Sequence, residues 1–157
     1  MIRLLPLYFV CACALAGADT GMGKDGTADG EKIRRYGVGA EVCSPFDTPA
    51  FDLDIGLDEA ACDAPTPTDG WIRISLWTDE LPPTSGDAYS FTIAEGRGEA
   101  SYFPPGGADP ILATQIELSF DAVVGDELSG RYTLDFDDGS RLAGEYEAVQ
   151  CSAESGC

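Results

Sequence analysis

The sequence predicts an all-β protein, an antiparallel two-sheet β-sandwich of about seven strands, with a partly open β-barrel as the alternative. The first observation behind this is a regular alternation of apolar and polar residues in successive segments of the second half. The second is that turn-forming residues separate these segments: Gly/Asp turns, and Pro-rich connectors such as Leu81-Pro-Pro and Phe103-Pro-Pro-Gly-Gly. The third is length, because about 140 residues remain after an N-terminal signal, which suits one domain.

Residues 1–16 are expected to be a secretory signal peptide, since one cation precedes a short apolar run and small residues. The signal has two possible ends. In one, Val10-Cys11-Ala12-Cys13 is a lipobox, and cleavage before Cys13 leaves a lipidated cysteine as the new N-terminus. In the other, Ala14-Leu15-Ala16 or Ala16-Gly17-Ala18 is an ordinary cleavage site with small residues at −3 and −1.

The cysteine count favours lipidation at Cys13. Of the six cysteines, Cys11 leaves with the signal and Cys13 carries the lipid, so an even set remains. The lipid then tethers the protein to a membrane, and Ala14 at the next position predicts delivery to the outer membrane. Without the lipid, we expect a periplasmic or extracellular protein. A spanning helix is not expected, because no apolar run reaches about 18 residues.

Residues 17–33 are expected to form a flexible, acidic, Gly-rich linker, a disordered tether that has little apolar surface to bury. Residues 34–157 are then the β-sandwich domain. Its first strand is predicted at Tyr36–Cys43, and an irregular Pro- and Asp-rich region is predicted from Ser44 to Gly70.

Six segments after Gly70 have the period-two pattern of strands. Trp71–Trp77 is predicted as one strand, and Tyr89, Phe91 and Ile93 are expected to pair with Ala100 and Tyr102 through a Gly96-Arg97 turn. In each of the last three predicted strands, alternate residues are expected to face the core. They are Thr114, Ile116, Leu118, Phe120 and Ala122 in the first; Leu128, Gly130, Tyr132, Leu134 and Phe136 in the second; and Leu142, Gly144, Tyr146 and Ala148 in the third.

The parity of these inward sets predicts their register, because residues that face each other across a hairpin share one face of the sheet. Phe120 is expected opposite Gly130, and Tyr132 opposite Tyr146, with an odd-length loop of five residues at Asp137–Arg141. The same register puts Arg131 opposite Glu147 on the solvent face.

Charge and composition exclude several classes of function. Asp and Glu number 28 against 9 Lys and Arg, so the net charge of −19 repels nucleic acid. The chain contains no histidine, which excludes Ser-His-Asp and Cys-His nucleophile pairs and His-ligated zinc. We therefore expect a protein that is not an enzyme. A hydrolase that uses paired carboxylates is an alternative, but its residues cannot be chosen among 28 candidates.

The four remaining cysteines, Cys43, Cys62, Cys151 and Cys157, are expected to form disulfides, as is usual in an exported chain. Short loops close most readily, which favours Cys43–Cys62 together with Cys151–Cys157. A bridge such as Cys43–Cys151 between the first and last strands is the alternative.

The strand Trp71–Trp77 contains the candidate ligand-binding residues Trp71, Arg73 and Trp77, which share one side of it. If Ile72, Ile74 and Leu76 face the core, the tryptophans lie outside, where their rings could stack on a sugar or a peptide. The alternative places both tryptophans inward at the ends of the sheet, closing the core.

Asp135, Asp137 and Asp138 are candidate ligands for Ca²⁺, a cation that prefers carboxylate oxygens. The alternative is that these residues are present because Asp and Gly form tight turns. The spacing of a complete calcium loop is absent, so no cofactor is expected, although Ca²⁺ remains open.

The C-terminal run from Gly130 to Cys151, with its alternating Tyr, Leu and Phe and its Asp138-Gly139 turn, resembles the closing hairpin of uncharacterised exported bacterial lipoproteins. The resemblance covers the last third of the chain and the signal peptide. It implies an envelope-anchored β-sandwich and supplies no active-site residues. The sequence thus predicts a non-enzymatic binding or structural module with a glycan or protein partner. A carbohydrate-binding or calcium-dependent adhesion domain is an alternative.

Overall fold

The computed structural model describes residues 34–43, 49–57, 59, 61–63 and 70–151. The signal peptide, Cys13, the linker and Cys157 lie outside these residues, as does the side chain of Cys43. The described part is all-β, with almost no helix. Its elements are β1 (Arg34–Cys43), β2 (Pro49–Leu57), β3 (Trp71–Trp77), β4 (Ala88–Thr92), a 3₁₀ turn η1 (Ile93–Glu95), β5 (Gly98–Phe103), β6 (Ile111–Val124), β7 (Glu127–Phe136) and β8 (Arg141–Cys151).

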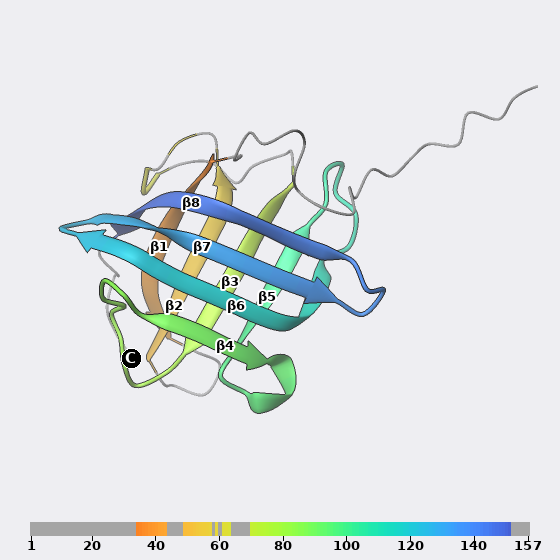
Figure 1. Cartoon of the computed structure of the whole chain (residues 1–157). Helices are drawn as coiled ribbons and strands as arrows, with labels where there is room; N and C mark the ends of the chain where they lie inside the picture. The colour runs from red at the N-terminus through yellow and green to blue at the C-terminus, as the bar shows by residue number, and fades with distance from the viewer. Residues whose placement is uncertain (1–33, 44–48, 58, 60, 64–69, 152–157) are drawn as a thin grey trace, which may run out of the picture.

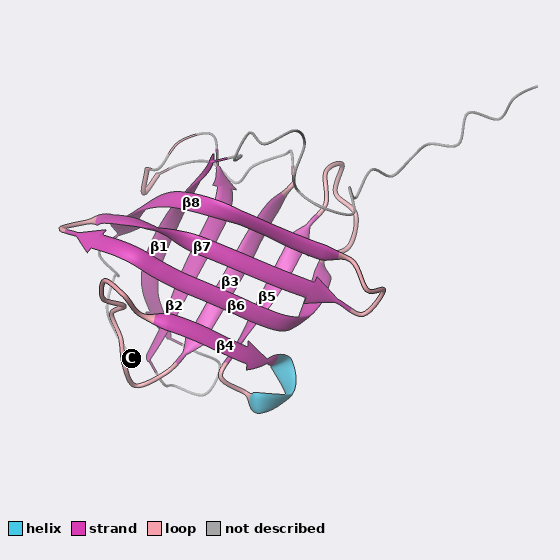
Figure 2. Ribbon diagram, in the orientation of Figure 1, coloured by secondary structure: helices cyan, strands magenta, loops and turns pink. Residues whose placement is uncertain are grey.

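Seven of the strands close into a barrel, in the order β6-β5-β3-β2-β1-β8-β7 and back to β6, and β4 adds to β6 from outside (Figure 1). Neighbouring strands are antiparallel, except that β1 and β8 run parallel. Figure 2 shows β4, β6, β7 and β8 crossing steeply over β1, β2, β3 and β5, so the barrel is flattened into two crossing layers.

The expected antiparallel two-sheet sandwich is therefore corrected to a closed mixed barrel. The length of β6 explains the closure, because its 14 residues exceed the width of one layer. On one edge of β6, the first residues pair with β5, where Leu112 lies opposite Ser101, and the middle residues pair with β4. On the opposite edge, β6 pairs with β7. Closure removes the free edges that two separate sheets would have.

The core lies between the two crossing layers. Phe120 is at its centre and makes edge-to-face contacts with Phe51, Tyr89 and Tyr146, at ring-centroid distances of 5.9, 6.1 and 6.1 Å. Such aromatic pairs contribute about 0.5–1.5 kcal/mol each beyond the burial of their area. The remaining large, fully buried side chains include Leu53, Ile55, Ile72, Ile74, Leu76, Ile116, Tyr132 and Leu134.

The predicted register is confirmed for the hairpin of β6 and β7, where Phe120 pairs with Gly130 and Ile116 with Leu134. The hairpin of β7 and β8 is displaced by two residues from the prediction. Tyr132 pairs with Gly144 instead of Tyr146. The loop is odd in length, as expected, but shorter, because the N–H of Gly139 donates to the carbonyl of Phe136 and closes a tight turn.

The displaced register also corrects the expected charge pairing on the solvent face. Arg131 has Glu145 as its cross-strand partner, not Glu147, and its guanidinium forms an ion pair with Asp121 of β6 at 3.1 Å.

Two expectations about the strands before β6 are wrong. The region predicted as irregular contains β2, whose Phe51, Leu53 and Ile55 are fully buried. The hairpin predicted between the segments of Tyr89 and Ala100 does not form, because β4 pairs with β6 and β5 pairs with β3. The chain leaves β4 through η1 and crosses between the layers at this point.

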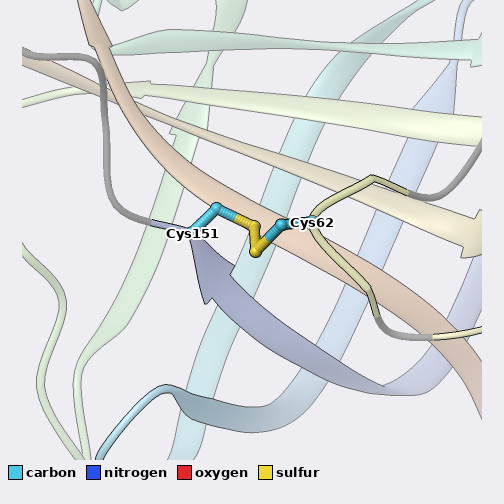
Figure 3. Close-up of a disulfide and its surroundings, with 2 residues drawn as sticks. All are labelled: Cys62 and Cys151. Atoms are coloured by element: carbon cyan, nitrogen blue, oxygen red, sulfur yellow. A yellow bond between two sulfur atoms is a disulfide. The ribbon is translucent and has the colours of Figure 1, made fainter.

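A disulfide joins Cys62 to Cys151, at the end of β8 (Figure 3), with a Cα–Cα distance of 5.6 Å. The favoured pairs Cys43–Cys62 and Cys151–Cys157 are therefore wrong, and Cys43–Cys151 is excluded as well. The two bridged residues are 89 positions apart in the sequence. Loop length predicts the wrong pairs because the parallel pairing of β8 with β1, and not chain proximity, decides where Cys151 lies.

Among the residues that the structure describes, no helix has the length and apolar character needed to cross a membrane.

Candidate functional site

Strand β3 carries its two tryptophans on the outside of the barrel. Ile72, Ile74 and Leu76 face the core and are at most 1% exposed, so the alternate residues Trp71, Arg73 and Trp77 point outward. The interpretation in which the tryptophans close the core from inside is therefore wrong.

The neighbouring strands complete an outer surface that we call the Trp71 face. It consists of Asp52, Asp54, Trp71, Arg73, Ser75 and Phe103. The register of the sheet places these residues side by side, because Asp52 pairs with Ser75, Asp54 with Arg73, and Trp71 with Phe103. Each pair spans two neighbouring strands among β2, β3 and β5, so the face is built on hydrogen-bonded strands and not on loops.

Arg73 is held by two groups at once. Its Nε and Nη2 donate to the two carboxylate oxygens of Asp54, both at 2.8 Å, and its Cζ lies 5.3 Å from the ring centroid of Trp71. The hydrogen bonds that Arg73 donates to Asp54 raise the pKa of its guanidinium, so the side chain stays charged at any physiological pH. A bidentate pair combined with a cation–π contact fixes the orientation of the guanidinium.

Trp71 is also stacked on Phe103. The two rings are nearly parallel, with an interplanar angle of 5° and a centroid distance of 4.0 Å. Phe103 therefore occupies one face of the indole, and the guanidinium of Arg73 also lies over the ring. The indole is therefore held in place by two neighbours.

Ser75 and Asp52 extend the face toward the middle of β3. The hydroxyl of Ser75 donates to a carboxylate oxygen of Asp52 at 2.6 Å, and Ser75 is only 6% exposed. On the side of β5, Leu112 lies next to Ser101 and is 45% exposed, which adds an apolar border near Phe103.

Trp77 does not join this cluster. It lies six residues from Trp71, which is about 20 Å along an extended strand. Its backbone N–H donates to the carbonyl of Arg97 at 2.8 Å, which ties this end of β3 to the segment before β5. Of the three predicted ligand-binding residues, the structure thus brings only Trp71 and Arg73 together.

The three predicted metal ligands have other partners or lie apart. Asp135 binds Arg141 through both oxygens, at 2.6 and 2.9 Å, and Asp138 accepts hydrogen bonds from the backbone N–H and hydroxyl of Ser140. Asp137 is exposed in the same turn. Within the described ranges, no group of three or more Asp, Glu, Cys or His side chains is arranged to hold a metal ion.

Two carboxylates on the outer surface, Asp121 and Asp135, lack the property that a general acid requires. Hydrogen bonds from Arg131 and Arg141 hold the pKa values of Asp121 and Asp135 below their usual range. A carboxylic acid that donates a proton near neutral pH needs a pKa raised by burial. These groups are surface ion pairs and not candidates for acid catalysis.

Sequence reasoning missed Asp54 and Phe103. Asp54 belongs to the run Phe51-Asp52-Leu53-Asp54-Ile55, whose period of two is the signal of a strand with an acidic outer side. Phe103 is the last residue before a Pro-rich connector, and no local pattern in the sequence shows that it stacks on Trp71.

Comparison with models of known protein families, with curated protein sequences and with solved structures found no match to this chain.

Proposed function

We propose that this chain is an exported, non-enzymatic binding module of the cell envelope, tethered through a lipid on Cys13 or released in soluble form, and that it binds a protein partner through the Trp71 face. The observation that carries the proposal is the placement of Trp71 and Arg73 on the outside of the barrel, on a strand whose alternate residues are buried in the core. Trp and Arg are the residue types that contribute most binding energy at protein interfaces.

The contacts within the Trp71 face hold its side chains in a fixed arrangement before any partner binds. Asp54 and Trp71 fix Arg73, and Phe103 fixes Trp71, so a partner that binds here does not have to order these side chains. Little side-chain entropy is then lost on binding.

The same contacts favour a protein over a glycan. A sugar-binding platform needs a free ring face, whereas Phe103 covers one face of Trp71 and Arg73 lies over the ring. The exposed Leu112 and the charged edge of Arg73 offer a mixed apolar and polar surface, as protein interfaces do.

The test is crosslinking of the full-length protein in its host cells. A photoreactive amino acid at Leu112 is expected to yield one discrete crosslinked protein, and Arg73→Ala is expected to abolish it. Arg131→Ala is the matched control, because Arg131 also pairs with an aspartate on the outer surface but contacts no tryptophan through a described cation–π pair. Equal crosslinking in both variants, or a glycan as the captured species, would contradict the proposal.

The anchor is tested separately by the intact mass of the mature protein. Lipidation predicts a polypeptide that begins at Cys13 and carries diacylglycerol. A protein that begins at Gly17 or Asp19 without added mass would show that it is not anchored.

A further inference from the structure

A second surface lies across the outer side of β1, β8, β7 and β6, away from the Trp71 face. The register arranges its side chains in two rows: Tyr36, Glu147, Ser129 and Ala122 form one, and Val149, Glu127 and Val124 form the other. A groove of about 490 Å³ follows these rows as far as Asp126 in the turn between β6 and β7. We call it the acidic groove.

The ends of the acidic groove are apolar and exposed. Tyr36 is 45% exposed at one end and Val124 is 69% exposed at the other. Three strand spacings, about 14 Å across the strands, separate them. Together with the groove between them, they give this surface apolar area that a partner would cover on binding.

The charged side chains that line the groove in the described part of the chain are acidic. Two of them, Asp126 and Glu127, lie at the turn between β6 and β7, beside the exposed Val124. The chain as a whole has a net charge of −19, so the surrounding field has the same sign as the groove.

We propose that the acidic groove docks an extended, lysine-containing segment of a cationic partner protein. Alternating lysines would place their ammonium groups beside Asp126 and Glu127, while their aliphatic stems cover Val124 and Tyr36. The ring of Tyr36 would also attract a cation. An extended segment of four or five residues spans the distance of about 14 Å between the ends of the groove.

This inference goes beyond the function proposed above, because it concerns a different face of the barrel and a partner of stated charge. The two proposals share no residue, so variants of one surface leave the other intact. Each can therefore fail alone.

The probe is a fluorescein-labelled peptide, acetyl-Lys-Val-Lys-Val-Lys-amide, whose binding to the full chain is measured by fluorescence anisotropy at low salt. The double variant Asp126→Asn, Glu127→Gln is expected to weaken binding about tenfold, because it removes two carboxylates that line the groove. The matched double variant Glu80→Gln, Glu99→Gln removes the same charge from exposed positions elsewhere and is expected to change the affinity less than about twofold.

A second pair of variants keeps the charge constant. Val124→Ser is expected to weaken binding about threefold or more, and Ile111→Ser, at an exposed site outside the groove, is expected to leave it unchanged. Circular dichroism verifies that all variants are folded. The proposal is overturned if the wild-type chain does not bind the peptide, if the two double variants lose affinity equally, or if Val124→Ser has no effect. The second of these outcomes would show attraction to the whole acidic surface.

Discussion

The hydroxyl of Tyr146 on β8 donates a hydrogen bond to the backbone carbonyl of Ser119 on β6, at 3.0 Å, although β7 lies between these strands. Gly130 of β7 makes this possible, since a Cβ atom there would lie only 2.7 Å from the Tyr146 hydroxyl. The tyrosine therefore ties together three neighbouring strands at the centre of the core.

Replacing Gly130 by Ala is expected to lower the free energy of unfolding by about 3 kcal/mol or more, because the added methyl group would overlap the backbone carbonyl oxygen of Ser119 on β6 and also press on the Tyr146 hydroxyl. Tyr146→Phe removes only the hydrogen bond and is expected to cost about 0.5–1.5 kcal/mol. Urea unfolding followed by tryptophan fluorescence measures both. A Gly130→Ala variant as stable as the wild type would show that the strands can move apart at no cost.

Alkaline pH is expected to unfold the protein. Burial raises the pKa values of Tyr89, Tyr132 and Tyr146. Because the folded pKa values exceed the unfolded value, the associated stability is fully present below about pH 10 and is lost as the pH rises through the folded values. Each buried phenol contributes a slope of up to about 1.4 kcal/mol per pH unit in this range.

The measurement for this prediction is phenolate absorbance together with circular dichroism between pH 8 and pH 12. The phenolate signal of the buried tyrosines should appear only together with loss of the β spectrum. Tyr146→Phe should reduce the steepness of the alkaline transition, and an unchanged slope would contradict the assignment to Tyr146.

Removal of the Cys62–Cys151 bridge is expected to destabilise the fold by about 2–4 kcal/mol, because the bridge closes a long loop and restricts the unfolded chain. The double variant Cys62→Ser, Cys151→Ser avoids an unpaired thiol at this site. Thermal unfolding of the variant beside the wild type, both oxidised, measures the difference. No loss of stability would mean that the two cysteines are not joined in the folded protein.

Peptide mapping under non-reducing conditions tests the disulfide pattern directly. The Cys62 and Cys151 peptides should migrate as one species. If all four cysteines of the mature domain are oxidised, as the even count predicts, the remaining bridge is Cys43–Cys157. Recovery of Cys43 linked to Cys62 would contradict the structure.

The contacts of Trp71 are expected to be energetically coupled. A double-mutant cycle with Trp71→Ala and Phe103→Ala should give a coupling energy of about 0.5–1.5 kcal/mol, since the rings stack at 4.0 Å. A cycle with Arg73→Ala and Asp54→Ala should give about 0.2–1 kcal/mol, because the ion pair is partly exposed to solvent. Additive effects within either cycle would show that the contact is not formed in solution.

Strand positions in the second half could be predicted from alternation alone, and parity predicted the register of Phe120 with Gly130. Parity cannot distinguish registers that differ by two residues, which is why Tyr132 was expected opposite Tyr146 and lies opposite Gly144. The length of the turn that follows Phe136 decides between them, and it depends on local hydrogen bonds that the pattern does not specify.

The closure of the barrel could not be predicted from the sequence, nor could the positions of Asp54 and Phe103 in the Trp71 face. Closure depends on the parallel pairing of β1 with β8, which joins distant parts of the chain and leaves no local signal. Trp71 and Arg73 were found because they share one side of an evident strand. Asp54 was missed because the Pro and Asp residues around β2 obscured its alternation, and without β2 the partner of Arg73 cannot be named.

The place of β8 between β1 and β7 has a consequence for the order of folding. Among the described strands the β1 segment comes first in the chain and the β8 segment last, so the barrel cannot close until the β8 segment is present. Until then one side of β1 remains available to wrong partners. We expect folding to begin with the local hairpin of β6 and β7 and to finish when the C-terminal strand inserts, a late step at which chaperones would have most to protect.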